Sequence, residues 1–454
     1  MNAYTSASRW SRVLLAAAMV AAPALAGAQT PAPGAKIGLQ DAIGIALKQS
    51  VLVKQSENAV ASSATGVSEA KNAFLPTLAL NTSSARSVGR AGTSSIASSS
   101  SQSLNTGLSS SLTVFNGLRN VNDLKQARLD VTANTSELTR ARQTAVYTVA
   151  SNYLTLATAE GQLSVQKENL SAQEAQEKQI ETQVKAGARS ISDLYQQQAT
   201  TASARASVVS AERDVELARI ALIQTLQLDP RVSYDFVAPT VGDVSGTVPK
   251  YDLDSLLARA FASRTDLAAE QTRVEAALVG TKAAAATRLP TVSINTSYNA
   301  SYNSAAAAAL GSQLDQNRGG SVSLAVSLPI FDRGATSTAV QQARIQEDNA
   351  RLALADQRQT VALDVRRAWL TLESTRQQLT VALAQKKAAD LAVSTTQARY
   401  QVGTSTLLEL TQARSSQLQA NVAVVNARNA LAFQDALLPY YTGELDPSKA
   451  LLAS

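Results

Sequence analysis

The chain contains an internal repeat, and this repeat limits its possible folds more than any other feature. The segment Leu75-Pro-Thr-Leu-Ala-Leu-Asn-Thr-Ser83 returns as Leu289-Pro-Thr-Val-Ser-Ile-Asn-Thr-Ser297, with six of nine positions identical. Each copy follows a helical pattern and precedes a loop rich in Ser or Ala, a second strand and a very long helical pattern. The sequence therefore predicts one structural unit that occurs twice.

The first 28 residues have the pattern of a secretory signal peptide. Arg9 and Arg12 supply positive charge before a short apolar run from Val13 to Val20, and Ala26-Gly27-Ala28 supplies the small residues of a cleavage site. The apolar run is too short to span a bilayer. Without the two arginines, the 41 Lys and Arg fall to 39 against 35 Asp and Glu, a mild excess that does not indicate a nucleic-acid partner.

The chain has no cysteine and no histidine. Nucleophilic sites that need either residue, zinc sites built from imidazole or thiolate, and lipid attachment through an N-terminal cysteine are therefore excluded. The sequence also has neither a Gly-rich phosphate loop nor a cluster of metal ligands. We therefore expect no enzymatic activity, no cofactor and no metal.

The repeat divides the rest of the chain into two units and a linker. We expect the first unit at 29–228, a Pro-containing linker at 229–252, the second unit at 253–447 and a C-terminal tail at 448–454. Each unit ends in a long helix pair, at 116–228 and 332–440. A first helix of about 70 residues is roughly 105 Å long. The chain then turns at Gly187 or Gly403, where we expect positive φ.

The second helix of each pair carries a heptad seam. A large residue recurs every seven positions, and alanine occupies positions three residues later, which favours close packing of paired helices. The members are Leu194, Thr201, Val208, Val215 and Leu222 with Ala204, Ala211 and Ala218, then Leu410, Gln417, Val424, Leu431 and Leu438 with Ala413, Ala420 and Ala427.

Strands are expected at about 77–88, 104–115, 291–303 and 320–331, joined by loops at 92–103 and 305–316. From Thr291 onward, polar residues alternate with a face that includes Ile294, Tyr298 and Tyr302. Such alternation is typical of transmembrane barrel strands. A soluble sheet would need another layer to cover its apolar face. Four strands cannot close a barrel alone, whereas three chains would supply twelve.

Two helix turns and two strand-to-helix junctions resemble those of a known family. The turns are Val184-Lys-Ala-Gly-Ala-Arg-Ser-Ile-Ser-Asp-Leu194 and Arg399-Tyr-Gln-Val-Gly-Thr-Ser-Thr-Leu-Leu-Glu-Leu-Thr-Gln-Ala413. The junctions are Phe115-Asn-Gly117 and Phe331-Asp-Arg-Gly334. With the duplication and the signal peptide, the chain resembles the outer membrane efflux protein family, the TolC-like channels, from about Leu39 to Pro447.

The resemblance implies a mainly α-helical chain with a transmembrane β part. Three copies would form a 12-stranded β-barrel in the outer membrane of a Gram-negative bacterium, continued by a long α-helical barrel in the periplasm. It implies an exit duct for efflux or type I secretion, which works passively with a periplasmic adaptor protein and an inner-membrane pump. Drugs, metal ions and polypeptides all remain possible cargoes, the pump is not identified, and the duct is either open or sealed.

The resemblance also implies a periplasmic gate at the two turns. Tyr400 matches the family's gate tyrosine, Asp193 the acid to which it bonds in the closed state, and Glu409 an acid of the ring at the constriction. Ser405 stands where a gate arginine is often found, and Gln412 where a second ring acid occurs. The turns that meet the adaptor are Ala186, Gly187, Ala188 and Arg189, and Val402, Gly403, Thr404 and Ser405.

Each of these assignments has a simpler alternative. Asp193 and Glu409 lie just after a glycine turn, where an acid also complements the N-terminal end of a helix dipole. Tyr400 fits ordinary packing of the seam. For the whole chain, the alternative is a periplasmic coiled-coil adaptor or spacer without a pore, which explains the heptads but gives no use to the strands.

Overall fold

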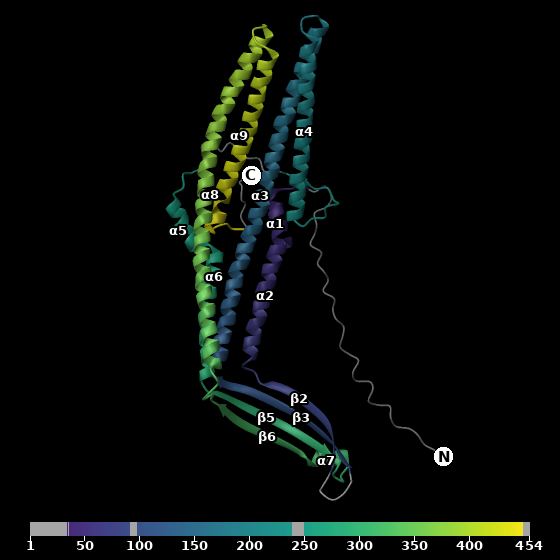
Figure 1. Cartoon of the computed structure of the whole chain (residues 1–454), viewed down its shortest axis with the longest axis vertical. Coiled ribbons are helices and arrows are strands. Elements are labelled where there is room, and N and C mark those ends of the chain that lie inside the picture. The colour runs from purple at the N-terminus through teal and green to yellow at the C-terminus, as the bar shows by residue number, and fades with distance from the viewer. Residues whose placement is uncertain (1–33, 35, 91–97, 238–248, 448–454) are drawn as a thin grey trace, which may run out of the picture.

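The computed structural model describes residue 34 and residues 36–90, 98–237 and 249–447. The expected signal peptide and C-terminal tail lie outside these residues. Long helices run side by side along the molecule, and a single curved sheet lies at one end of them (Figure 1). The turns between the long helices lie at the opposite end (Figure 1).

The two units have nearly the same order of elements. The first contains α1 (Leu39–Gln49), α2 (Val51–Asn72), β2 (Thr77–Arg90), β3 (Ser98–Asn116), α3 (Arg119–Lys185) and α4 (Ile191–Thr225). The second contains α5 (Leu253–Ser263), α6 (Thr265–Ala285), the 3-10 helix η1 (Ala286–Arg288), β5 (Thr291–Asn303), α7 (Leu310–Gln316), β6 (Arg318–Ser327), α8 (Ala335–Gln401) and α9 (Leu407–Thr442). At the start of the first unit, β1 (Lys36–Ile37) pairs in parallel with β4 (Asp235–Phe236), which lies in the linker between the units.

Several bounds differ from those expected from sequence. The last strand was expected to reach residue 331, but β6 ends at Ser327, shortly before Pro329, which has no amide hydrogen for a strand ladder. The loop expected at 305–316 contains α7, and part of the loop expected at 92–103 belongs to β3. In α7, the buried Gln313 side chain donates to the carbonyl oxygens of Asn303 and Ala308, at 3.1 and 2.6 Å.

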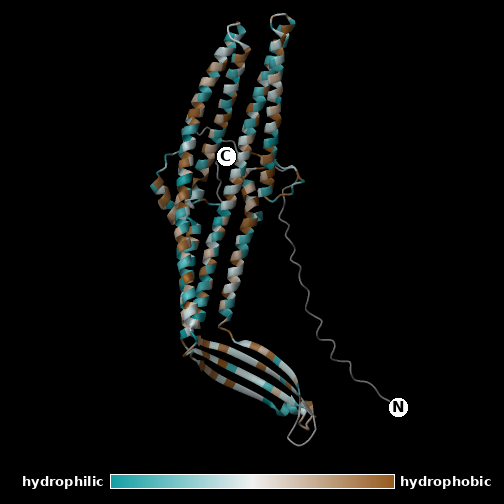
Figure 2. Ribbon diagram, viewed as in Figure 1, coloured by the Kyte–Doolittle hydropathy of each residue, from teal (hydrophilic) through white to brown (hydrophobic). Residues whose placement is uncertain are grey.

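The sheet has the order β2-β3-β5-β6, and all its pairs are antiparallel. The two units therefore meet between β3 and β5, where Leu108 lies opposite Tyr298 and Leu104 opposite Tyr302. The apolar face is exposed in the single chain: Leu80 is 72% exposed and Val322 76%. Alternation of apolar and polar residues is visible along the strands (Figure 2).

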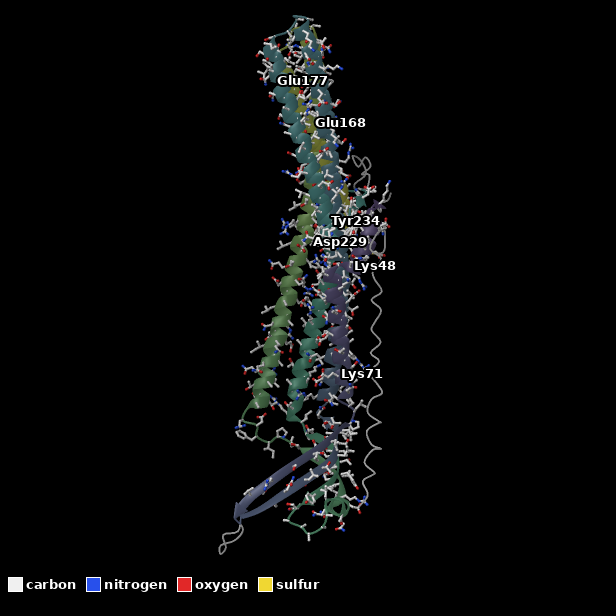
Figure 3. The ribbon with its side chains drawn as sticks, turned by 90° about the vertical axis from the view of Figure 1, so that its right-hand side faces the viewer. Lys48, Lys71, Glu168, Glu177, Asp229 and Tyr234 are labelled. Atoms are coloured by element: carbon white, nitrogen blue, oxygen red, sulfur yellow. The ribbon has the colours of Figure 1, made fainter. Side chains whose placement is uncertain are left out.

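The heptad seams bury the side chains that pair the long helices. Every seam position of α4, from Leu194 to Leu222, is buried. In α9, the buried seam residues include Leu410, Ala420, Val424, Ala427, Leu431 and Leu438. On the side of the molecule shown in Figure 3, the helices carry polar side chains, with Lys71, Glu168 and Glu177 as examples. Among the described residues, no helix is both long enough and apolar enough to cross a membrane.

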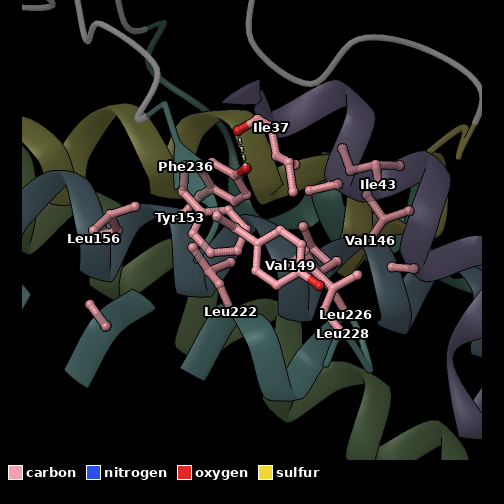
Figure 4. Packing of buried hydrophobic residues seen from close by; sticks show 14 of the residues in the cluster. Ile37, Ile43, Val146, Val149, Tyr153, Leu156, Leu222, Leu226, Leu228 and Phe236 are labelled. Carbon is pink, nitrogen blue, oxygen red and sulfur yellow. Dashed lines mark hydrogen bonds between the residues drawn. The ribbon is translucent and has the colours of Figure 1, made fainter. Parts of the chain in front are cut away.

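The largest apolar core among the described residues lies where β1 and β4 pack against α1, α3 and α4 (Figure 4). Tyr153 of α3 is at its centre, with an exposed fraction of 1%. Its hydroxyl donates to the carbonyl oxygen of Ile37 at 2.7 Å, and its ring meets that of Phe236 edge to face. This core holds the short strands to the long helices of the first unit.

Candidate functional site

The two helix turns at the far end of the molecule have the same backbone geometry. Gly187 and Gly403 have φ of +70° and +78°, so the positive φ expected at both glycines is confirmed. The amide of Ala188 donates to the carbonyl oxygen of Gln183 at 2.8 Å, and that of Thr404 to Arg399 at 2.9 Å. These bonds close a Schellman turn at the end of α3 and of α8.

The helices that follow the turns begin with different caps. At the start of α4, the Ser190 hydroxyl accepts from the amide of Ser192 at 3.1 Å. At the start of α9, Thr406 and Glu409 form a capping box: each side chain accepts from the other residue's backbone amide at 3.2 Å. Ala186 ends α3 as its C-cap, and Val402 does the same for α8.

The carboxylate of Glu409 is directed back onto its own turn. The buried Ser405 hydroxyl donates to it, and this hydrogen bond holds the pKa of Glu409 below its usual range, helped by the amide of Thr406. Gln412 is exposed, and its carbonyl oxygen accepts from Ser416. The geometry of the single chain thus places Glu409 as a helix cap.

Tyr400 lies in the small apolar core of this end of the molecule. Its exposed fraction is 2%, and it packs with Ile180, Leu194, Leu407 and Leu410. Burial raises the pKa of its hydroxyl. Because these neighbours come from α3, α4 and α9, the side chain of Tyr400 joins the two helix pairs.

Arg189 makes the polar contact to Tyr400 across the two turns. Its guanidinium lies over the Tyr400 ring, 4.3 Å from the ring centre, and donates to the Tyr400 carbonyl oxygen at 3.4 Å. The expected bond between Tyr400 and Asp193 is not formed: within the described parts of the chain, the Tyr400 hydroxyl has no hydrogen-bond partner. Sequence reasoning placed Arg189 in the turn but did not foresee its stacking on the tyrosine of the other unit.

The turns also expose apolar side chains. Val402 is 75% exposed and Leu408 76%, and Ile191 and Tyr195 are exposed on the first turn. Exposure of apolar side chains to water is unfavourable, so a group of them at one end of a molecule is typical of a contact surface.

A buried ionic group near the middle of the molecule joins α3, α6 and α8 at the joint between α5 and α6, and sequence reasoning missed it. Arg264 pairs with Asp266 at 2.5 Å and with Asp364 at 3.4 Å, and Arg140 approaches Asp266 at 3.5 Å. Burial alone would raise the pKa of Asp266, but the hydrogen bonds and charge of Arg264 outweigh it and lower that pKa. The sequence feature that could have indicated this group is the pair of opposite charges in Arg264-Thr-Asp266, between two short helical segments.

No cluster of three acidic side chains that could hold a metal ion occurs among the described residues. The arrangement as a whole offers packed long helices, a sheet with an exposed apolar face and, at the opposite end, two helix turns in contact through Arg189 and Tyr400.

Comparison with known proteins identifies the family. The outer membrane efflux protein family matches residues 42–226 and 256–444, so both units are covered. The outer membrane efflux protein BepC of Brucella suis is 23% identical over 332 residues, which is 73% of this chain and 70% of BepC.

Two solved channels have a similar fold. The Campylobacter jejuni CmeC outer membrane channel has a TM-score of 0.76 at 18% identity and covers 91% of this chain and 87% of its own. The Neisseria gonorrhoeae MtrE outer membrane channel, solved in its open state, has a TM-score of 0.73 at 23% identity and covers 91% of each chain.

The matches confirm the predictions of a mainly α-helical chain with a transmembrane β part, of an outer membrane location with a large periplasmic part, and of an efflux exit duct. They do not favour the coiled-coil adaptor without a pore. The chain belongs to the outer membrane efflux protein family.

Proposed function

We propose that three copies of this chain form one closed duct, a 12-stranded barrel continued by a tunnel of long helices. The observation that carries the proposal is the sheet itself, which has four strands, an exposed apolar face and two free edges, β2 and β6. Pairing β6 of one copy with β2 of the next removes every edge, and closed barrels are the way β-structure spans a membrane. The apolar face then contacts outer membrane lipid.

The helices give the duct its reach through the periplasm. At 1.5 Å per residue, the 67 residues of α3 and of α8 each span about 100 Å. The duct performs no bond chemistry, and an inner-membrane pump supplies the energy for transport. A periplasmic adaptor links the two by binding the helix turns, and the exposed Val402, Leu408 and Ile191 support an apolar contact there.

We assign the gate to the same turns. Opening requires α8 and α9 to move away from α3 and α4, which separates the Tyr400 ring from the Arg189 guanidinium. In the closed state, the Tyr400 hydroxyl, which has no hydrogen-bond partner among the described residues, donates to the Asp193 carboxylate. Ser405, Glu409 and Gln412 line the approach to the constriction on the second turn.

The assembly is tested by cell fractionation and by gel electrophoresis of unheated against boiled samples. We expect the protein in the outer membrane fraction, and a band at three times the mass of the chain that heating converts to a single chain. A monomer in the soluble periplasmic fraction would contradict the duct and support the adaptor alternative.

The gate is tested by single-channel conductance in planar bilayers. The double variant Asp193→Ala and Tyr400→Phe should conduct more than the wild type, because the link between the two helix pairs is lost. Glu409→Ala should reduce the preference for cations, and Gln412→Ala, on the same helix, is its control. Unchanged conductance in the double variant would remove the gate assignment while leaving the trimeric duct intact.

A further inference from the structure

The polar face of the sheet is built from uncharged side chains. On β5 it includes Ser293, Asn295, Ser297, Asn299 and Ser301. The register places Ser, Thr, Asn or Gly opposite each of them on β3, and Ser, Gly or Ala opposite the first four on β6. The same residue types continue onto β2, where Asn81 lies opposite Gly107. This face lines the interior when the barrel closes with its apolar face toward lipid.

Among the residues of these four strands whose side chains the structure describes, the charged ones are Arg86 and Arg318, and both belong to the other face. Arg86 pairs with Gln102 and Arg318 with Ala300, positions that alternate in phase with Leu80 and Tyr298. The alternation of the pleat therefore directs charge away from the interior.

The polar side chains of the interior face bond to one another. The Ser111 hydroxyl donates to the Asn295 side-chain oxygen at 2.9 Å, and the Ser297 and Ser321 hydroxyls lie 2.9 Å apart. The amide of Asn81 donates to Ser109 at 3.1 Å. Because these groups already have partners, they offer a passing solute no strong binding site, and conduction needs binding that is weak enough to release.

We infer that the membrane section of this duct is an electrically neutral, amide- and hydroxyl-lined passage that admits anionic, cationic and uncharged solutes alike. Any charge selection then arises in the helical section. The inference rests on the proposed closed barrel. Its physical basis is that a cleft lined by one sign of charge concentrates counter-ions by about 10-fold or more, whereas a neutral lining does not.

The test uses the absence of cysteine from the sequence. A single cysteine at Ser297 (S297C) reports on the interior face, and Thr296→Cys, one residue away on the apolar face, is its control. Purified trimers in lipid vesicles are treated with thiol reagents of similar size, one carrying a trimethylammonium group and one a sulfonate. Each rate is divided by the rate of that reagent with a free thiol.

We expect S297C to react with both reagents at similar normalised rates that change little with salt, and Thr296→Cys to react slowly with either. When Asn295→Asp is added to S297C, the normalised rate of the cationic reagent should exceed that of the anionic reagent about 10-fold. This positive control would show that the assay can detect one added charge per chain. A comparable preference in S297C alone would overturn the neutral passage while leaving the duct intact. Equal reactivity at 296 and 297 would overturn the barrel itself, and the inference with it.

Discussion

The two units share one backbone plan but place different polar chemistry on it. Both first helices are 67 residues long, and both end in the same glycine turn. In the first turn, Arg189 reaches across to Tyr400 of the second unit. In the second turn, the Glu409 carboxylate bonds, within the described parts of the chain, to Ser405 and Thr406 of its own turn. A repeated backbone therefore supports two roles: contact between the units at one turn, and stability of the local helix at the other.

The same asymmetry occurs where the short helices of each unit meet. The joint between α1 and α2 lies at Ser50 (φ −54°, ψ 127°), and that between α5 and α6 at Arg264 (φ −70°, ψ 120°). At the second joint, Arg264 and Asp266 form the buried ionic group, whereas Leu52 of the first unit is 44% exposed. The joint of the second unit is therefore linked to α3 and α8 by ion pairs, through Arg140 and Asp364.

The largest effect is expected when this ionic group is broken. Asp266→Asn leaves Arg264 and Arg140 buried with one carboxylate fewer, which should lower the free energy of unfolding by about 3–5 kcal/mol. Leu52→Asn, at the corresponding joint of the first unit, should change it by less than about 0.5 kcal/mol. Urea unfolding of the purified channel measures both, and equal losses would mean that the two joints are energetically alike.

The glycine turns should respond equally, because their backbone is shared. Gly187→Ala and Gly403→Ala each place a β-carbon at positive φ, at a cost of about 1–2 kcal/mol, and no heavy atom lies within 4 Å to add a steric term. Gly66→Ala is the matched control, since it lies inside α2 with equal space and should stabilise by up to about 1 kcal/mol. The midpoint of thermal unfolding distinguishes the three variants, and a clear difference between the turns would contradict their equivalence.

The sequence predicted the features that repeat and missed those that depend on one contact. The heptads located α4 and α9 because a seam such as Leu194 to Leu222 must be buried whatever the neighbour is. Gln313 shows the limit of prediction from periodicity. Its side chain orders α7 through hydrogen bonds to Asn303 and Ala308, and no sequence periodicity predicts such bonds. Arg189 was placed in its turn, but its partner lies 211 residues away, and only the packing of the helix pairs brings it near.

A smaller effect is expected from the contact between the turns. Arg189→Gln removes a cation–π interaction worth about 0.5–1 kcal/mol at a partly exposed site. Hydrogen exchange should therefore become faster at both turns. Arg399→Gln is the control, because the Arg399 guanidinium donates to the Thr404 carbonyl oxygen within its own turn, at 3.3 Å. Its removal should make hydrogen exchange faster at the second turn only. Faster exchange confined to the first turn in Arg189→Gln would show that the contact does not join the units.

The smallest effect concerns Glu409, and its sign decides between two roles. As a cap, Glu409 has a pKa below its usual range because Ser405 donates to the carboxylate, so its contribution to stability is present above the ordinary pKa and is lost as pH falls through the lowered one. As a member of a ring, three carboxylates around a narrow axis would raise one another's pKa.

Thermal unfolding of the trimer from neutral to acidic pH, compared with Glu409→Gln, isolates this contribution. If Glu409 is mainly a cap, wild type and variant should converge only below the usual range of a glutamate, and Ser405→Ala should move the convergence to higher pH. A wild type that is less stable than Glu409→Gln at neutral pH, with a difference that begins to shrink above that range and does not depend on Ser405→Ala, would show that repulsion within the ring dominates. The second turn would then serve the constriction as well as its own helix, and the division of roles between the two turns would no longer hold.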